Sequence, residues 1–173
     1  SELDSAEMEL LWQSWPSIPL ERRRELVARL VTMAEDDVDM DFDRVFRHCL
    51  EDEDPEVREK AVSGLWECDD RTLVGPLIGL MNSDPVERVR ASAAISLGKF
   101  SALSAFGKLL PKDGEWIQAQ LISIVQNGHE SIEVRRRALE SVAVFDTGKI
   151  TGLIHQAYQS IDQRMRVSAA YAM

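Results

Sequence analysis

Apolar residues recur along the chain at the spacing expected of helices that bury one face. Four segments share the template V-R-x-x-A, once with methionine in place of valine, and further apolar residues follow four, five and eight positions after the first. Residues at this spacing lie on one face of a helix with about 3.6 residues per turn, so each segment predicts an amphipathic helix. The four segments start at Val57, Val89, Val134 and Met165, and a degenerate copy surrounds Arg23.

The arginines of the template indicate that these segments are internal repeats. They occupy positions 23, 58, 90, 135 and 166, at intervals of 35, 32, 45 and 31 residues. Each copy is followed by a turn and a second apolar segment, which predicts second helices at 73–81, 116–125 and 150–158. The long interval of 45 residues predicts an inserted short helix at 101–110.

Start signals support the first helices of the repeats. Asp54-Pro55 and Asp84-Pro85 each place a side-chain acceptor at the N-cap and a proline at the first helical position, where the missing N–H costs nothing. Glu87 would complete a capping box with Asp84.

The N-terminal segment lacks the repeat template but has a helix start of its own. Asp4 and Glu7 fit a capping box, and Leu3 and Met8 fit a hydrophobic staple around it. The helix that starts here should end near the turn at Trp15. We interpret it as a cap on the stack of repeats.

Helix pairs at a period near 30 to 35 residues, opened by DPEVR and DPVERVR, resemble the HEAT-repeat family, in particular a short bacterial kind similar to phycobilisome-lyase-type repeats. The resemblance covers roughly residues 20–173. It implies an all-α fold, a right-handed α-α superhelix (α-solenoid) of about four to five helix pairs. In such a fold the first helices line the convex side, and the second helices line a concave groove that is used mostly to bind other proteins.

The expected organisation is an N-terminal capping helix and turn at 1–19, followed by the repeat array at 20–173. The last repeat stops inside a first helix, which would expose an apolar face at the end of a solenoid. We therefore expect the natural protein to be longer. The expected repeats are approximately 20–53, 54–83, 84–130 with the short helix 101–110 inserted, 131–160 and the truncated 161–173.

Composition is that of a soluble globular protein, because 45% of the 173 residues are hydrophobic and 29% are charged. No apolar run approaches the ~18 residues that a membrane helix needs, and no basic and apolar leader starts at Ser1. We therefore expect a cytoplasmic protein that does not bind membranes. Cys49 and Cys68 lie in apolar segments without CxxC spacing, which predicts buried free thiols rather than a disulfide or a zinc site.

The net charge of −10 is concentrated in the first third of the chain. Residues 1–60 contain 18 acidic and 8 basic residues, whereas residues 61–173 contain 12 of each. An acidic surface repels phosphate backbones, whose binding needs clustered lysine and arginine. Nucleic acid is therefore not expected as a partner.

The most acidic stretch is EDDVDMDFD at 35–43, with six acids in nine residues. A calcium loop that started at Asp37 would place Phe42 where glycine is required and His48 where a bidentate glutamate is required, so calcium is not expected. We interpret 36–41 as a solvated turn between the helices of the first repeat. An electrostatic patch for a basic partner is the alternative.

Other candidate sites fail on spacing. VFDTGKIT would need glycine at Ala143 and serine or threonine at Ile150 to form a phosphate loop, so Thr147 is interpreted as an N-cap. His129 is the one histidine followed by glutamate, which leaves too few ligands for a di-iron site. The repeated arginines are interpreted as structural, with stems over apolar residues and heads paired with nearby acids. We expect no catalytic residue, metal or cofactor.

Tryptophan is enriched at binding surfaces, and the chain has four. Trp66 ends a repeat helix and Trp116 begins another, so we expect both to pack in the core or between repeats. Trp15, beside Pro16 in the capping segment, is the best candidate for partial exposure.

The leading hypothesis is a non-enzymatic scaffold that binds a protein or peptide, a basic one among the candidates, along the concave groove. Complementary charge on the groove and on the acidic N-terminal rim would select the partner. The alternatives are an accessory lyase or chaperone for a tetrapyrrole chromophore, suggested by the lyase-like repeats, and a HEAT-like DNA repair glycosylase, which the acidic balance opposes. The candidate binding residues are Glu35, Asp36, Asp37, Asp39, Asp41, Arg44, Arg47, His48, Arg71, Lys149, His155 and Gln159.

Overall fold

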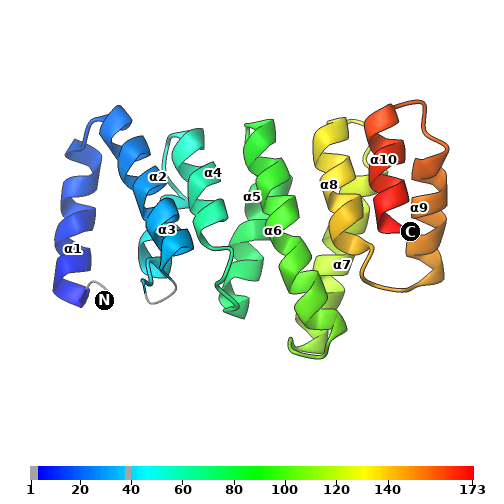
Figure 1. The fold of residues 1–173 in the computed structure, drawn as a ribbon, viewed down its shortest axis with the longest axis horizontal. Coiled ribbons are helices and arrows are strands. Elements are labelled where there is room, and N and C mark those ends of the chain that lie inside the picture. Colours follow the sequence, from blue (N-terminus) through cyan, green and yellow to red (C-terminus); the bar gives the residue numbers. More distant parts are fainter. Residues whose placement is uncertain (1–3, 38–39) are drawn as a thin grey trace. The chain divides into compact units, whose positions relative to one another are not determined.

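The computed structural model of the chain describes residues 4–37 and 40–173 (Figure 1). Every regular element in these residues is helical, so the prediction of an all-α fold is confirmed. Leu3, and with it the expected staple, lies outside the described residues, as does Asp39. The chain forms two compact units, Ser1–Cys68 and Asp69–Met173. None of the described helices is long and apolar enough to cross a membrane.

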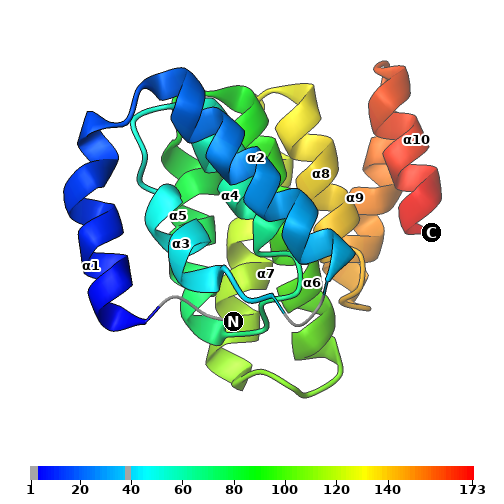
Figure 2. The same ribbon diagram turned by 60° about the vertical axis from the view of Figure 1, so that its left-hand side comes forward.

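The N-terminal unit is built of helices. Its described elements are α1 (Ser5–Ser14), the 3-10 helix η1 (Trp15–Ser17), α2 (Leu20–Asp36), α3 (Asp43–Cys49) and α4 (Pro55–Gly64). Figure 2 shows α2 lying across α4, and α3 also packs on α4. The core contains Val27 of α2, Val45 and Phe46 of α3 and Val57 of α4, each of them at most 2% exposed.

The C-terminal unit consists of helix pairs in which neighbours pack on one another. Its elements are η2 (Arg71–Leu73), α5 (Val74–Ser83), α6 (Glu87–Ala105), α7 (Pro111–Gln126), α8 (Ile132–Val142), α9 (Gly148–Tyr158) and α10 (Gln163–Ala172). The first helices α6, α8 and α10 pack side by side, while α5 packs on α6, α7 on α6 and α8, and α9 on α10 (Figure 1). Leu97, Phe100, Leu121 and Leu139 are fully buried between them. This packing of successive helix pairs is that of an α-solenoid, as predicted.

Three predicted helix starts are present in the structure. The carboxylate of Asp4 accepts hydrogen bonds from the first turn of α1, and Glu7 accepts one from the N–H of Asp4, which completes the capping box. Asp54 caps α4, with Pro55 as its first residue. Thr147 caps α9. In each case the side chain satisfies backbone N–H groups that lack a partner within the helix.

The predicted N-cap at Asp84 is wrong. The helix α6 begins at Glu87, its N-cap Val86 provides no side-chain acceptor, and the expected capping box is therefore not formed. Asp84 instead accepts a hydrogen bond from the N–H of Val86, and Arg90 donates to the Asp84 carbonyl at 2.8 Å. Arg58 follows Asp54 by four residues, whereas Arg90 follows Asp84 by six. The two additional residues form a bend before the helix starts.

The expected short helix at 101–110 does not form as a separate element. The helix α6 continues through Ala105, and the next helix starts at Pro111. A Schellman motif ends α6, because the N–H groups of Gly107 and Lys108 donate bonds of 2.9 and 2.8 Å to carbonyls three and five residues earlier. Gly107 has φ of +70°, a conformation that glycine adopts without strain. The additional length of this repeat therefore lies in α6 and in the start of α7.

Three of the template arginines tie the preceding turn to their own helix. Their guanidinium groups donate hydrogen bonds of 2.7–3.0 Å to backbone carbonyls five or six residues earlier. Carbonyls at the end of a turn lack a partner within the helix that follows, so these contacts support the structural interpretation of the arginines, although the acceptors are carbonyls as well as the expected acids. The contacts join Arg58 to Asp52 and Glu53, Arg90 to Asp84, and Arg166 to Ser160 and Ile161.

The contact between α3 and α4 leaves no room for a side chain at Gly64. A Cβ added there would lie 2.5 Å from Cζ of Phe46, whose side chain is 1% exposed. We expect Gly64→Ala to lower the free energy of unfolding by about 1–3 kcal/mol through overpacking, as measured by urea denaturation. The matched control is Gly79→Ala in α5, where nothing lies within 4 Å and alanine should stabilise the helix by up to about 1 kcal/mol. Equal stability of the two variants would contradict this expectation.

Candidate protein-binding surfaces

The described acidic residues of the predicted binding rim are exposed. Glu35 and Asp36 end α2, Asp37 follows, and Asp41 accepts a hydrogen bond of 2.8 Å from the first N–H of α3. The last turn of α2 contains no basic residue, so its own helix does not compensate this negative charge. The arrangement fits both the solvated turn and the alternative of a patch for a basic partner.

The three α3 residues that were expected to line the groove have different surroundings. Arg44 is exposed. Arg47 is half-buried, and its Nη2 donates to Sγ of Cys68 at 3.4 Å. His48 stacks on Trp12, with ring centroids 3.7 Å apart and ring planes inclined by 17°. Arg47 and His48 therefore contribute to the packing of the N-terminal unit itself.

The two cysteines are free and buried, as predicted. Burial, assisted by the charge of Asp52, raises the pKa of the Cys49 thiol to about 12. The thiolate is the reactive form of cysteine, so Cys49 is inert at neutral pH.

Trp15 is 5% exposed, so the prediction that it is partly exposed is wrong. Its indole Nε1 donates at 2.7 Å to Oδ2 of Asp52, and Nη1 of Arg23 donates to the same oxygen at 2.9 Å. Nη2 of Arg23 donates to Glu53 at 2.5 Å. A cavity of about 400 Å³ lies beside these residues, with His48 in its wall. Because Arg23, Asp52 and Trp15 already bind one another, we interpret this cluster as structural.

The four predicted binding residues of the C-terminal unit are all exposed. Arg71 forms an ion pair of 3.3 Å with Asp113 of α7. Lys149 lies in the first turn of α9, His155 lies in its last turn, and Gln159 is its C-cap. The structure thus places three of these residues on one helix and joins the fourth to α7.

Trp116 was expected to pack in the core or between repeats, and it lies outside the core against a neighbouring helix pair. Its side chain is 44% exposed, and its indole lies against Gly75 of α5, where an added Cβ would be 3.7 Å from Cη2. On the same two helices, Asn82 of α5 donates a hydrogen bond of 2.8 Å to Gln120 of α7. The buried residues of α7 define its inner face, and Trp116 lies one turn before Gln120 on another face. Trp66, for which the same two environments were expected, is 51% exposed.

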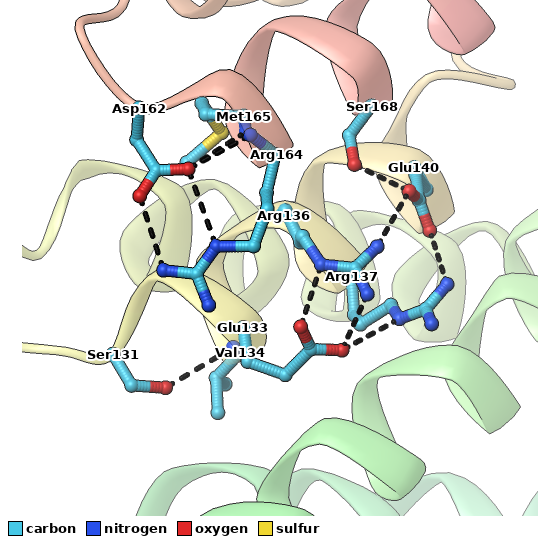
Figure 3. Close-up of polar contacts among 10 residues, drawn as sticks. All are labelled: Ser131, Glu133, Val134, Arg136, Arg137, Glu140, Asp162, Arg164, Met165 and Ser168. Carbon is cyan, nitrogen blue, oxygen red and sulfur yellow. Dashed lines mark hydrogen bonds and ion pairs between the residues drawn. The ribbon is translucent and has the colours of Figure 1, made fainter.

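A charged cluster lies along one side of α8 and contacts Ser168 of α10 (Figure 3). Glu133 accepts hydrogen bonds from Arg136 at 2.6 Å and Arg137 at 3.1 Å. Glu140 accepts from the same two arginines and from Ser168 of α10. Burial alone would raise the pKa of Glu133, but the bonds from Arg136 and Arg137 outweigh it and lower the pKa. Two carboxylates balance two guanidinium groups, so we interpret the cluster as structural.

These helix pairs were compared with known proteins and families. Residues 44–114 match the HEAT-repeat family. The matched stretch runs from α3 to the beginning of α7. HEAT repeats generally act as protein-interaction scaffolds and are generally not enzymes. No curated protein matches the chain, and the closer likeness to phycobilisome-lyase-type repeats stays a prediction.

Proposed function

We propose that the protein is a non-enzymatic, cytoplasmic scaffold that binds a protein or peptide through the α5–α7 face, which we define by Arg71, Gly75, Asn82, Asp113 and Trp116. The observation that carries this proposal is the half-exposed indole of Trp116, held against Gly75 on the second helices of the C-terminal unit. Tryptophan is the residue most often found as an anchor at protein interfaces. The HEAT-repeat match supports the same class of function.

The polar contacts beside Trp116 support this choice of surface. The ion pair of Arg71 with Asp113 and the hydrogen bond of Asn82 with Gln120 both join α5 or η2 to α7. An apolar anchor with polar neighbours is the common composition of an interface core and its rim. Because the contacts already exist in the free protein, a partner would not have to order this surface on binding.

The other predicted residues have a secondary role in this proposal. Lys149, His155 and Gln159 extend the binding region along α9. The acidic residues 35–37 attract a basic partner at long range, which raises the association rate at low salt rather than the affinity of the final contacts. The net charge of −10 argues against a nucleic acid as the partner.

Affinity capture with Trp116→Ala tests the proposal. Wild-type protein immobilised on beads should retain a specific protein from a cell lysate, and Trp116→Ala should retain at least about tenfold less of it, since anchor residues contribute about 2 kcal/mol or more. The matched control is Phe106→Ala, which removes a 77% exposed aromatic side chain from the same unit and should retain as much as wild type. Quantitative mass spectrometry gives the recovered amounts, and circular dichroism verifies the fold.

Equal recovery of the partner by wild type and Trp116→Ala would contradict the proposed surface. Failure of the wild type to retain any protein would contradict the scaffold function itself. Retention of a tetrapyrrole with a shift in its absorbance, and of no protein, would favour the alternative of an accessory lyase or chaperone.

A further inference from the structure

Two template arginines bind an acid in the turn before the next first helix. In the N-terminal unit, Arg23 donates through Nη1 and Nη2 to Asp52 and Glu53, the two residues before the N-cap of α4. In the C-terminal unit, Arg90 donates through Nε at 3.0 Å and Nη2 at 2.9 Å to Glu130, the residue before the N-cap of α8. Hydrogen bonds between a guanidinium and a carboxylate are among the stronger polar contacts in proteins. In each of these two repeats, the acid therefore holds the turn to the preceding first helix.

Arg135, the template arginine of α8, has no such partner. The two residues before the N-cap of α10 are Ser160 and Ile161, and Ile161 is 99% exposed. Nε of Arg135 donates at 3.1 Å to the carbonyl of Val125. In residues 4–37 and 40–173, this is the single hydrogen bond of its guanidinium, which forms no ion pair there. The two terminal nitrogens of Arg135 are thus left without an acceptor from the protein.

A cavity of about 440 Å³ opens beside Arg135. Val125, Leu153 and Met165 provide apolar walls, and Ser160 contributes a polar group. This volume lies in the range of ligand sites, about 300–1,000 Å³, and it exceeds what a carboxylate alone would fill. The site therefore combines a guanidinium with room for an aliphatic group.

We propose that this cavity binds the carboxylate of a glutamate or aspartate side chain in a peptide segment of a partner protein. Nη1 and Nη2 of Arg135 donate to the carboxylate, in the way that Nη1 and Nη2 of Arg23 donate to the carboxylates of Asp52 and Glu53 in the N-terminal unit. An aliphatic neighbour of the acidic residue packs against Leu153 and Met165. The partner thereby supplies the acid that Glu130 supplies to Arg90 within the chain. This site goes beyond the α5–α7 face, because it uses different residues and a different chemistry.

Restoring the missing acid tests the site without disturbing the core. Ile161→Glu places a carboxylate immediately before the N-cap of α10, where Glu130 stands before α8, and it should occupy Arg135. The exposure of Ile161 means that no packing is lost. The matched control is Ile161→Gln, which has the same length and no charge. The probes are the capped tripeptides acetyl-Leu-Glu-Leu-amide and acetyl-Leu-Gln-Leu-amide, titrated against each variant by NMR.

In the wild type, the glutamate peptide should saturably shift the Nε–Hε signal of Arg135 and the backbone amide of Ser160. The glutamine peptide should bind at least about tenfold more weakly, because it lacks the charge-assisted hydrogen bonds. Ile161→Gln should bind the glutamate peptide like wild type, whereas Ile161→Glu should bind it at least about tenfold more weakly.

Equal affinity for the two peptides, or the absence of a saturable shift, would overturn the proposal. Binding of the glutamate peptide by Ile161→Glu with wild-type affinity would do so as well. If acetate bound with the same affinity as the glutamate peptide, the assignment of the site to a peptide segment would be overturned. Trp116→Ala should bind the tripeptide unchanged, so the outcome is independent of the test of the α5–α7 face.

Discussion

Arg23→Ala is expected to lower the free energy of unfolding of the N-terminal unit by about 3–5 kcal/mol. The side chain of Asp52 is 1% exposed, and Arg23 provides its counter-ion at 2.9 Å. Without the guanidinium, the carboxylate stays buried, and the donors left to it among the described residues are the indole N–H of Trp15 and the backbone N–H of Asp54. An uncompensated buried charge costs much more than the pair itself contributes.

The matched control for this change is Arg22→Ala, one position earlier on the same helix. The Arg22 side chain is 53% exposed, and its ion pair is with Glu25, which is 63% exposed. Exposed pairs contribute little because water and salt screen them, so the expected loss is less than about 0.5 kcal/mol. Two neighbouring arginines should thus differ severalfold or more in their effect on stability.

Urea denaturation followed by tryptophan fluorescence can measure this difference. In a Trp116→Phe background the remaining tryptophans, Trp12, Trp15 and Trp66, all belong to the N-terminal unit, so the signal reports on that unit. A loss for Arg23→Ala no larger than that for Arg22→Ala would show that the buried cluster does not stabilise the fold.

Leu139→Ala is expected to lower the free energy of unfolding of the C-terminal unit by about 2–5 kcal/mol. Leu139 is fully buried on α8, the helix that packs on α6, α7 and α10. Truncation removes apolar contacts and leaves a cavity that these helices can fill only partly, since cores are closely packed. The loss of stability should therefore affect the whole C-terminal unit.

Leu110→Ala provides the matched control, because it makes the same change in the same unit at a residue that is 45% exposed. Its expected cost is less than about 1 kcal/mol. Urea denaturation followed by circular dichroism gives both values, and hydrogen exchange of α8 shows where protection is lost. Similar losses for the two variants would contradict the central position of α8 in the core.

Most of the helices could be predicted from short-range pattern. The template copies at Val57, Val89, Val134 and Met165 all lie in α-helices, and each of these four residues is at most 3% exposed. Amphipathic spacing and caps act over a few residues, so they can be recognised without knowledge of the rest of the fold. The wrong N-cap at Asp84 could also have been avoided from the sequence, because Asp84 is further from Arg90 than Asp54 is from Arg58.

The continuation of α6 was harder to predict. An interval of 45 residues suggested an additional helix, whereas the structure lengthens existing helices and ends α6 at Ala105, two residues before the positive-φ glycine Gly107. The length of the repeat interval alone does not distinguish an inserted helix from longer existing helices. The Phe106-Gly107 pair could have indicated a helix end, since glycine commonly follows the last helical residue.

The candidate site was predicted only in part. Charged residues such as Arg44 and Lys149 were correctly expected at the surface, but the binding role of the predicted residues stays a proposal. Trp15 was expected to be partly exposed but is buried, and Trp66 was expected in the core or between repeats but is half-exposed. Exposure of a tryptophan depends on which helix covers it and on which polar group can accept its N–H, and neither follows from its neighbours in sequence.

Short-range pattern was sufficient for the all-α class, for most of the helices and for the recurrence of an arginine in each repeat, because amphipathic spacing and helix capping involve residues within a few turns of one another. Tertiary packing decided how each arginine is used. Arg23 and Arg90 reach acids about 30 and 40 residues further along the chain, whereas Arg135 faces a cavity with no acid. A charge becomes structural or available for a ligand according to the groups that folding brings within hydrogen-bonding distance of it.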